Sequence, residues 1–198
     1  MAGKYWKQFM PFYFFAGVSA AWLAAAAYSQ PLAIGKIALL VTAGLLSWGF
    51  VEYVLHRFIF HYQARTARMH SIIYAMHLSH HDNPKALDQL FASLRMSAPI
   101  AACYCLLAWL LVGSWQEVGY LFTGLIVGYF CYELLHYQAH HGSPRWRPFQ
   151  YLKKYHMLHH YYSSQSRFGV TSPFVDMMFG TYQPVNLRRR EPIIDRES

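Results

Sequence analysis

Four stretches of the chain are apolar over the length that a membrane-spanning helix requires, which is about 20 residues. Each contains an uncharged run, and two of the runs are short but continue as helical patterns into polar residues, the first as far as His56 and the second through Glu133 to His140. Within a bilayer, a helix satisfies all of its backbone hydrogen bonds internally. The sequence therefore predicts an all-α integral membrane protein with four transmembrane helices, at about 11–29, 32–56, 96–115 and 118–138.

The composition agrees with a single membrane domain covering residues 1–198. The chain is 55% hydrophobic and only 13% charged, whereas a soluble domain has about 25% charged residues. The first apolar stretch has no small-residue cleavage site after it, so we expect a retained span and not a signal peptide. The three cysteines lie in apolar runs and are expected to be reduced: Cys103, Cys105 and Cys131.

Positive charges are distributed unequally among the segments that join the spans. Two segments, 57–95 and 139–198, hold most of the lysines and arginines, whereas the two opposite loops contain only Lys36 and Glu117 as charged residues. Because positive loops remain in the cytosol, both segments and both termini are predicted to be cytosolic. The Arg188–Arg190 run then forms a tail near anionic lipid. The net charge of +8 needs no nucleic-acid partner, because no basic helix or aromatic-basic platform stands apart from the apolar stretches.

The histidines fall almost entirely in the two predicted cytosolic segments and repeat a pattern. In each segment a pair of histidines precedes a cluster of three, and the same sixteen-residue step separates His61 from His77 and His140 from His156. This spacing indicates a parallel duplication in the chain. The ten residues are His56, His61, His77, His80, His81, His136, His140, His156, His159 and His160.

The spacing within each set favours metal binding. Residues four apart share one face of a helix, so His136 and His140 converge, and the three members of a cluster lie within an arc of about 100 degrees. His56 and His61 are five apart and would diverge on an ideal helix, so we expect the helix to end or tighten between them. Ten imidazoles shared by two ions give five each and leave room for water or oxygen; imidazole suits iron, zinc, copper and nickel.

Other polar residues near the spans are not expected to bind the metal directly. His70 is expected to be an interfacial residue, and His141 to lie at a helix end or to support a ligand without binding the metal itself. Glu52 and Glu133 lie at the predicted cytosolic ends of spans, where they could orient a ligand histidine through its second nitrogen or instead form salt bridges with neighbouring cations. Asp176 is a further expected partner of the ligands.

These segments resemble the fatty acid hydroxylase superfamily of membrane metal enzymes, and most of all its sphingolipid fatty-acid 2-hydroxylases. The resemblance implies that the ten histidines are the metal ligands and that a cytosolic cap holds them. It extends from Trp48 to Thr181 and is carried by Trp48–His61, His77–His81, Gly128–Tyr129, His136–His140, His156–His160, Phe168–Val170, Asp176 and Phe179–Thr181.

The resemblance also implies a reaction and its cofactors. We expect an oxygen-dependent hydroxylation of a lipid acyl chain, most of all at C2, by a di-iron-type monooxygenase, although zinc can occupy such a site in a purified sample because it binds imidazole more tightly than ferrous iron. Many eukaryotic relatives begin with a cytochrome b5 domain, and this chain begins almost at once with the first span. The expectation is therefore an external donor, cytochrome b5 or a ferredoxin-type reductase, and a bacterial inner membrane in preference to the endoplasmic reticulum.

Two other classes of function stay open at this stage. A sterol or carotenoid hydroxylase, or a desaturase, could use the same scaffold. A non-redox zinc membrane protein is the other alternative, but a catalytic zinc site needs about three protein ligands, and transporters place their ligands at the middle of the bilayer.

Overall fold

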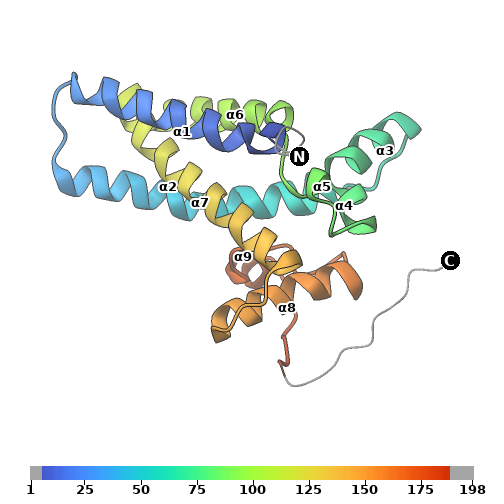
Figure 1. Cartoon of the computed structure of the whole chain (residues 1–198). Coiled ribbons are helices and arrows are strands. Elements are labelled where there is room, and N and C mark those ends of the chain that lie inside the picture. Colours follow the sequence, from blue (N-terminus) through green and yellow to red (C-terminus); the bar gives the residue numbers. More distant parts are fainter. Residues whose placement is uncertain (1–5, 188–198) are drawn as a thin grey trace. The chain divides into compact units, whose positions relative to one another are not determined.

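The structure is a computed structural model that describes residues 6–187, and it is helical with no strand in that range (Figure 1). The Arg188–Arg190 run lies outside the described residues. Four helices are long and apolar enough to cross a membrane, which confirms the predicted all-α class. They correspond to α1 (Trp6–Ala27), α2 (Ile34–Val54) with its continuation η2 (Leu55–Phe60), α6 (Leu94–Val112) and α7 (Trp115–His141).

The described chain forms two compact units. The first comprises residues up to Trp48 and the segment Phe91–Phe130, so it contains α1, α6 and the N-terminal parts of α2 and α7. The second comprises Gly49–Leu90 and the residues from Cys131 onward. All ten clustered histidines belong to this second unit, which therefore carries the candidate site.

Two glycines allow α2 and α7 to approach closely in the first unit. A Cβ atom added to Gly44 would lie 2.0 Å from the carbonyl oxygen of Leu121, and one added to Gly124 would lie 2.0 Å from the carbonyl oxygen of Val41. Both distances are far below van der Waals contact. Helices in membranes lack a hydrophobic drive towards one another, so small residues at a crossing permit the backbone contact that stabilises it.

Aromatic side chains fill the space beside this crossing. Phe12 of α1 packs on Phe91 and Phe130, with ring centroids 5.7 and 5.1 Å apart, and α1 lies beside α6 (Figure 1). Trp22 packs on Phe122 at 5.5 Å, and its indole N–H donates to the carbonyl oxygen of Trp115 at 3.0 Å. The partly exposed indole thus has a polar partner for its N–H group.

The turn between α6 and α7 is set by two residues. Gly113 adopts the left-handed conformation with φ of 69° and its N–H donates to the carbonyl oxygen of Trp109, an ending that glycine favours because it has no Cβ. Ser114 then accepts a hydrogen bond from the N–H of Glu117. Helix α6 therefore stops a few residues before the predicted end of the third span, and α7 starts earlier than the predicted 118.

The second unit is built from short helices around the histidines. After η2 come α3 (Ala67–Ile73), η3 (Tyr74–Leu78), α4 (Ser79–Asp82) and α5 (Leu87–Leu90); the end of α7 leads to α8 (Arg147–Tyr161) and α9 (Phe174–Met178). Thr66 caps α3 by accepting from the N–H of Met69. Tyr53, Phe168 and Val175 form a buried hydrophobic cluster.

The α2–α7 crossing generates a prediction. Replacing Gly124 by alanine forces the two backbones apart, and overpacking of this kind costs about 1–3 kcal/mol. Gly17 of α1 is the matched control, because a Cβ there meets nothing within 4 Å and alanine improves helix propensity by up to about 1 kcal/mol. Thermal unfolding in detergent should show a lower midpoint for Gly124→Ala only; equal midpoints for both variants would contradict the close crossing.

Candidate metal centre

The ten histidines lie in two groups of five, and within each group one ring nitrogen of every histidine is within 4.8 Å of the others. Eight of the ten side chains come from four helical segments, η3, α4, α7 and α8; His56 lies in η2 and His61 directly follows it. The first group is His56, His61, His77, His81 and His159; the second group is His80, His136, His140, His156 and His160.

A wide helical turn brings His56 and His61 together. The segment η2 is a π-helix in which the N–H of His61 donates to the carbonyl oxygen of His56 at 3.1 Å. Because a π-helix pairs residues five apart, these two rings come to lie 5.1 Å apart. The helix does end here, but it widens before it ends, so the alternative expectation that it tightens is wrong.

The two clusters of three share one geometry. His77 lies in a second π-helix, η3, and is followed by His80 and His81 in α4; the second cluster lies near the end of α8. In each cluster the first and last members are one turn apart and face the same side, whereas the middle member lies about 100 degrees round from the last. The middle histidine is therefore directed away from the other two.

Because the middle histidine points away from its cluster, each half of the chain contributes one histidine to the group that the other half mainly forms. The Nε2 atom of His80 is 2.9 Å from that of His136 and 3.0 Å from that of His140, so His80 joins the second group. The Nε2 atom of His159 is 3.0 Å from that of His61, so His159 joins the first group. Each group thus takes four histidines from one half of the chain and one from the other.

Backbone carbonyls orient two ligands of the first group. The Nδ1 atom of His56 contacts the carbonyl oxygen of Phe168, and that of His159 contacts the carbonyl oxygen of Ser166 at 2.7 Å. A carbonyl oxygen only accepts hydrogen bonds, so each Nδ1 carries the proton. The lone pair of each Nε2 then faces the centre of the group, which is the tautomer a metal ligand needs.

The nitrogen positions fit a metal ion in each group. Neighbouring Nε2 atoms are 2.9–3.1 Å apart in both groups. A metal–nitrogen bond of about 2.1 Å places nitrogens at right angles about 3.0 Å apart. Neutral imidazole nitrogens suit iron and zinc, so the donor set and its spacing could hold two such ions.

Burial keeps five histidines of the two clusters of three neutral. Loss of solvent, and then the neighbouring histidines, hold the pKa of His77, His156, His159 and His160 well below the ordinary value. The same burial lowers the pKa of His80 to about 4. At neutral pH these rings are deprotonated, and a metal ion does not have to displace a proton to bind them.

The carboxylates expected beside the ligands contact the chain between α8 and α9. Glu52 accepts hydrogen bonds from the N–H groups of Val170 and Thr171, and Asp176 accepts from those of Phe168 and Gly169 at 2.9 and 2.8 Å. They act on the backbone whose carbonyls orient the histidines and not on ring nitrogens. Glu133 is fully buried one turn before His136 in α7.

Sequence reasoning did not find the two carbonyls that orient the ligands. Ser166 and Phe168 act through main-chain oxygens, which every residue possesses, so no side-chain pattern marks them. The only signal was the resemblance of Phe168–Val170 to the family. His70 and His141 are exposed and lie outside both groups, where they stack on Tyr74 and Tyr137.

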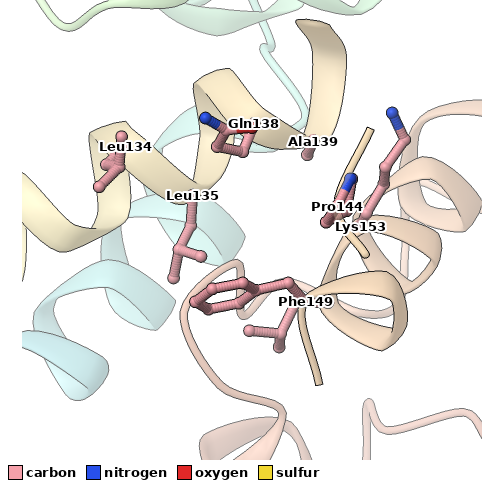
Figure 2. A pocket seen from close by; sticks show the side chains of 8 residues that line it. Leu134, Leu135, Gln138, Ala139, Pro144, Phe149 and Lys153 are labelled. Atoms are coloured by element: carbon pink, nitrogen blue, oxygen red, sulfur yellow. The ribbon is translucent and has the colours of Figure 1, made fainter. Parts of the chain in front are cut away.

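An apolar cavity of about 300 Å³ lies between the end of α7 and α8 (Figure 2). Leu135 and Ala139 on its wall each immediately precede a histidine of the second group. The amino group of Lys153 donates to the carbonyl oxygen of Gly142 at 2.6 Å. A cavity with mostly apolar walls and a few polar groups is typical of a hydrophobic ligand site; its lining is Leu134, Leu135, Gln138, Ala139, Pro144, Phe149, Leu152 and Lys153.

Comparison with known proteins agrees with this geometry. The fatty acid hydroxylase family model matches residues 41–181. A dihydroceramide fatty acyl 2-hydroxylase of Arabidopsis thaliana is 36% identical over 77% of this chain and 64% of its own length. A ceramide very long chain fatty acid hydroxylase of Saccharomyces cerevisiae is 35% identical over 83% of this chain and 44% of its own length.

A solved structure is also similar. Full-length scs7p, of which only the hydroxylase domain is visible, superimposes with a TM-score of 0.73 at 30% identity and covers 86% of this chain and 67% of that one. This chain therefore spans less than two thirds of the plant relative and less than half of the yeast relative. Both organisms are eukaryotes, so these relatives give no support to the expected bacterial inner membrane.

The exchange of His80 and His159 yields a prediction about metal content. His80→Ala and His159→Ala should each lower the content of the purified protein from about two ions per chain to about one, because the affected group loses one of its five donor nitrogens. Inductively coupled plasma mass spectrometry measures this directly. His70→Ala, which removes an exposed histidine outside both groups, should leave the content unchanged; full content in both of the first two variants would rule out the ligand assignment.

Proposed function

The chain belongs to the fatty acid hydroxylase family, and from that premise we propose that it hydroxylates C2 of a long acyl chain, either of a fatty acid or of a sphingolipid. The observation that carries the proposal is the pair of five-nitrogen groups, whose ten histidines all lie within residues 41–181, the part of the chain that the family model matches. The ten histidines are the proposed ligands. Iron ions bound by them would supply oxygen activation and cleavage of an unactivated C–H bond.

The proposed reaction balances with one external donor. One oxygen atom of O2 enters the C2–H bond as a hydroxyl group, and the other leaves as water after uptake of two electrons and two protons. Cytochrome b5 or a ferredoxin-type reductase is the proposed class of donor. The names of the relatives, a dihydroceramide fatty acyl 2-hydroxylase and a fatty acid 2-hydroxylase of mouse, support position 2.

The residues of this chain hold and shield the centre. The buried rings of His56, His80, His136, His156 and His159 exclude water from both groups, which protects a reactive oxygen species from side reactions. The apolar cavity between α7 and α8 offers a surface for a hydrocarbon chain next to the second group's helices (Figure 2). We propose that the chain is a multi-pass membrane protein whose metal ligands face the cytosol.

The reaction is tested with the purified protein, ferrous iron, O2 and a reductase system. Palmitate or a dihydroceramide deuterated at C2 should give a 2-hydroxy product that has lost one deuterium and gained one atom from 18O-labelled oxygen, as judged by mass spectrometry. His80→Ala should reduce the rate by at least about 100-fold, because the interactions that stabilise the transition state are lost. An alkene would indicate a desaturase, a hydroxysterol a sterol enzyme, and an oxygen-independent product a zinc protein.

The orientation is tested with accessibility tags. Tags at Met1, within residues 64–83 and at Ser198 should all report the cytosolic side, because the positive residues flank those segments. A tag within residues 113–116 should report the opposite side. An extracytoplasmic signal from residues 64–83 would reverse the proposed orientation and remove access to cytosolic donors.

A further inference from the structure

We propose that Asp176 and Glu52 are positioning residues that clamp the segment 166–171 and, through its carbonyl oxygens, hold the first histidine group more rigidly than the second. The inference rests on the proposed metal centre. It assigns the two groups different metal affinities although each contains five histidines. The metal of the first group is expected to be retained and that of the second group to exchange more readily.

The segment 166–171 has to be held by side chains because it has no regular structure. It joins α8 to α9 without helical hydrogen bonds, yet Ser166, Phe168 and Val170 are each at most 4% exposed. Buried backbone N–H groups require partners. Two carboxylates supply them for four consecutive residues, Asp176 for 168 and 169 and Glu52 for 170 and 171.

One peptide unit connects Asp176 to a ligand of the first group. The N–H of Gly169 donates to Oδ2 of Asp176 at 2.8 Å. The carbonyl oxygen in that same peptide unit belongs to Phe168 and accepts from Nδ1 of His56. Hydrogen bonds in such a chain polarise one another, so the aspartate increases the basicity of the carbonyl and, through it, of the imidazole nitrogen that faces the metal.

A second peptide unit connects the same aspartate to His159. The carbonyl oxygen of Ser166 accepts from Nδ1 of His159, while the N–H of Arg167 in that peptide unit donates to the carbonyl oxygen of Thr181 at 3.1 Å. Thr181 in turn donates its hydroxyl to Oδ1 of Asp176 at 2.6 Å, and its N–H to the carbonyl oxygen of Asp176. Both orienting carbonyls therefore depend on Asp176.

Glu52 secures the other end of the segment. Besides its two N–H donors it accepts from the hydroxyl of Thr171. The adjoining residue Tyr53 hydrogen-bonds Thr181 through its hydroxyl at 3.0 Å and accepts from Arg57. The clamp therefore begins on α2, directly before the helix that carries His56.

Three histidines of the second group have no such carbonyl partner among the described residues. The Nδ1 atoms of His80, His136 and His156 are buried and contact no hydrogen-bond partner within the described part of the protein. Partners of the second nitrogen typically contribute 10–100-fold in metal affinity. The difference between the groups predicts stepwise loss of metal, first from the second group and then from the first.

The test is the metal content of the intact protein after dialysis against a mild chelator. Asp176→Asn keeps the size of the side chain but presents an N–H2 group to one of its two N–H donors, so the first group should lose about 10–100-fold in affinity. Glu117→Gln is the matched control, because it removes a carboxylate of the first unit that pairs only with Lys36 among the described residues. The control should behave as wild type.

Double variants assign the loss to one group. With the second group disabled by His140→Ala, adding Asp176→Asn should take the retained content from about one ion to nearly none. With the first group disabled by His61→Ala, adding Asp176→Asn should leave the content unchanged. Cobalt-substituted protein offers a second readout, because the visible absorption of the first group should change and that of the second should not.

Milder variants keep the test valid if Asp176→Asn does not fold. Thr181→Val and Thr171→Val each remove one hydroxyl from the clamp and should give smaller losses from the first group, with helicity and elution volume unchanged. Equal loss from both groups, or wild-type retention in all clamp variants, would overturn the proposal. A wild-type protein that binds no metal at all would instead overturn the proposed metal centre.

Discussion

Imidazole nitrogens that face one another at about 3 Å, in two groups of five, are the constraint on which the second unit depends. In His56 and His159 the second nitrogen already donates to a carbonyl, so the nitrogens that meet at the centre present lone pairs. Lone pairs repel one another unless a cation lies between them. The burial of most of these rings, the lowered pKa of histidines such as His77 and His159, and the spacing of the nitrogens all suit the binding of positive ions other than protons.

The duplicated histidine pattern produces a centre that neither half of the chain completes by itself. Four members of each group come from one half, and the fifth is the middle residue of the other half's cluster, His80 or His159. The exchange follows from helix geometry, since the middle member of a three-residue cluster points away from its neighbours. An ion bound in either group would link α4 to α8, because each group takes histidines from both helices.

The irregular segment 166–171 packs beside the first histidine group and contacts two of its rings. A buried segment without helical hydrogen bonds is costly, and Glu52 and Asp176 remove that cost by accepting from four successive N–H groups. The carbonyls of the same segment then orient two ligands. The two π-helices, η2 and η3, also depart from regular α-helical geometry near the histidines. In η2 the wider turn brings together His56 and His61, which are five residues apart, and η3 holds His77 next to its junction with α4.

The sequence by itself determined the helical class, the four apolar spans and the set of ten histidines, because these depend on composition and spacing along the chain. It also marked Glu52 and Asp176 as important, but not what they contact. Only the tertiary structure decided that His80 and His159 exchange groups, that η2 widens to bring His61 beside His56, and that the carbonyls of Ser166 and Phe168 orient ligands. The exchange and the carbonyl contacts depend on the direction of side chains and main-chain groups between segments about one hundred residues apart, and periodicity describes direction only within a single helix. The widening of η2 is local, but a pattern that assumes a regular α-helix does not reveal a π-helical turn.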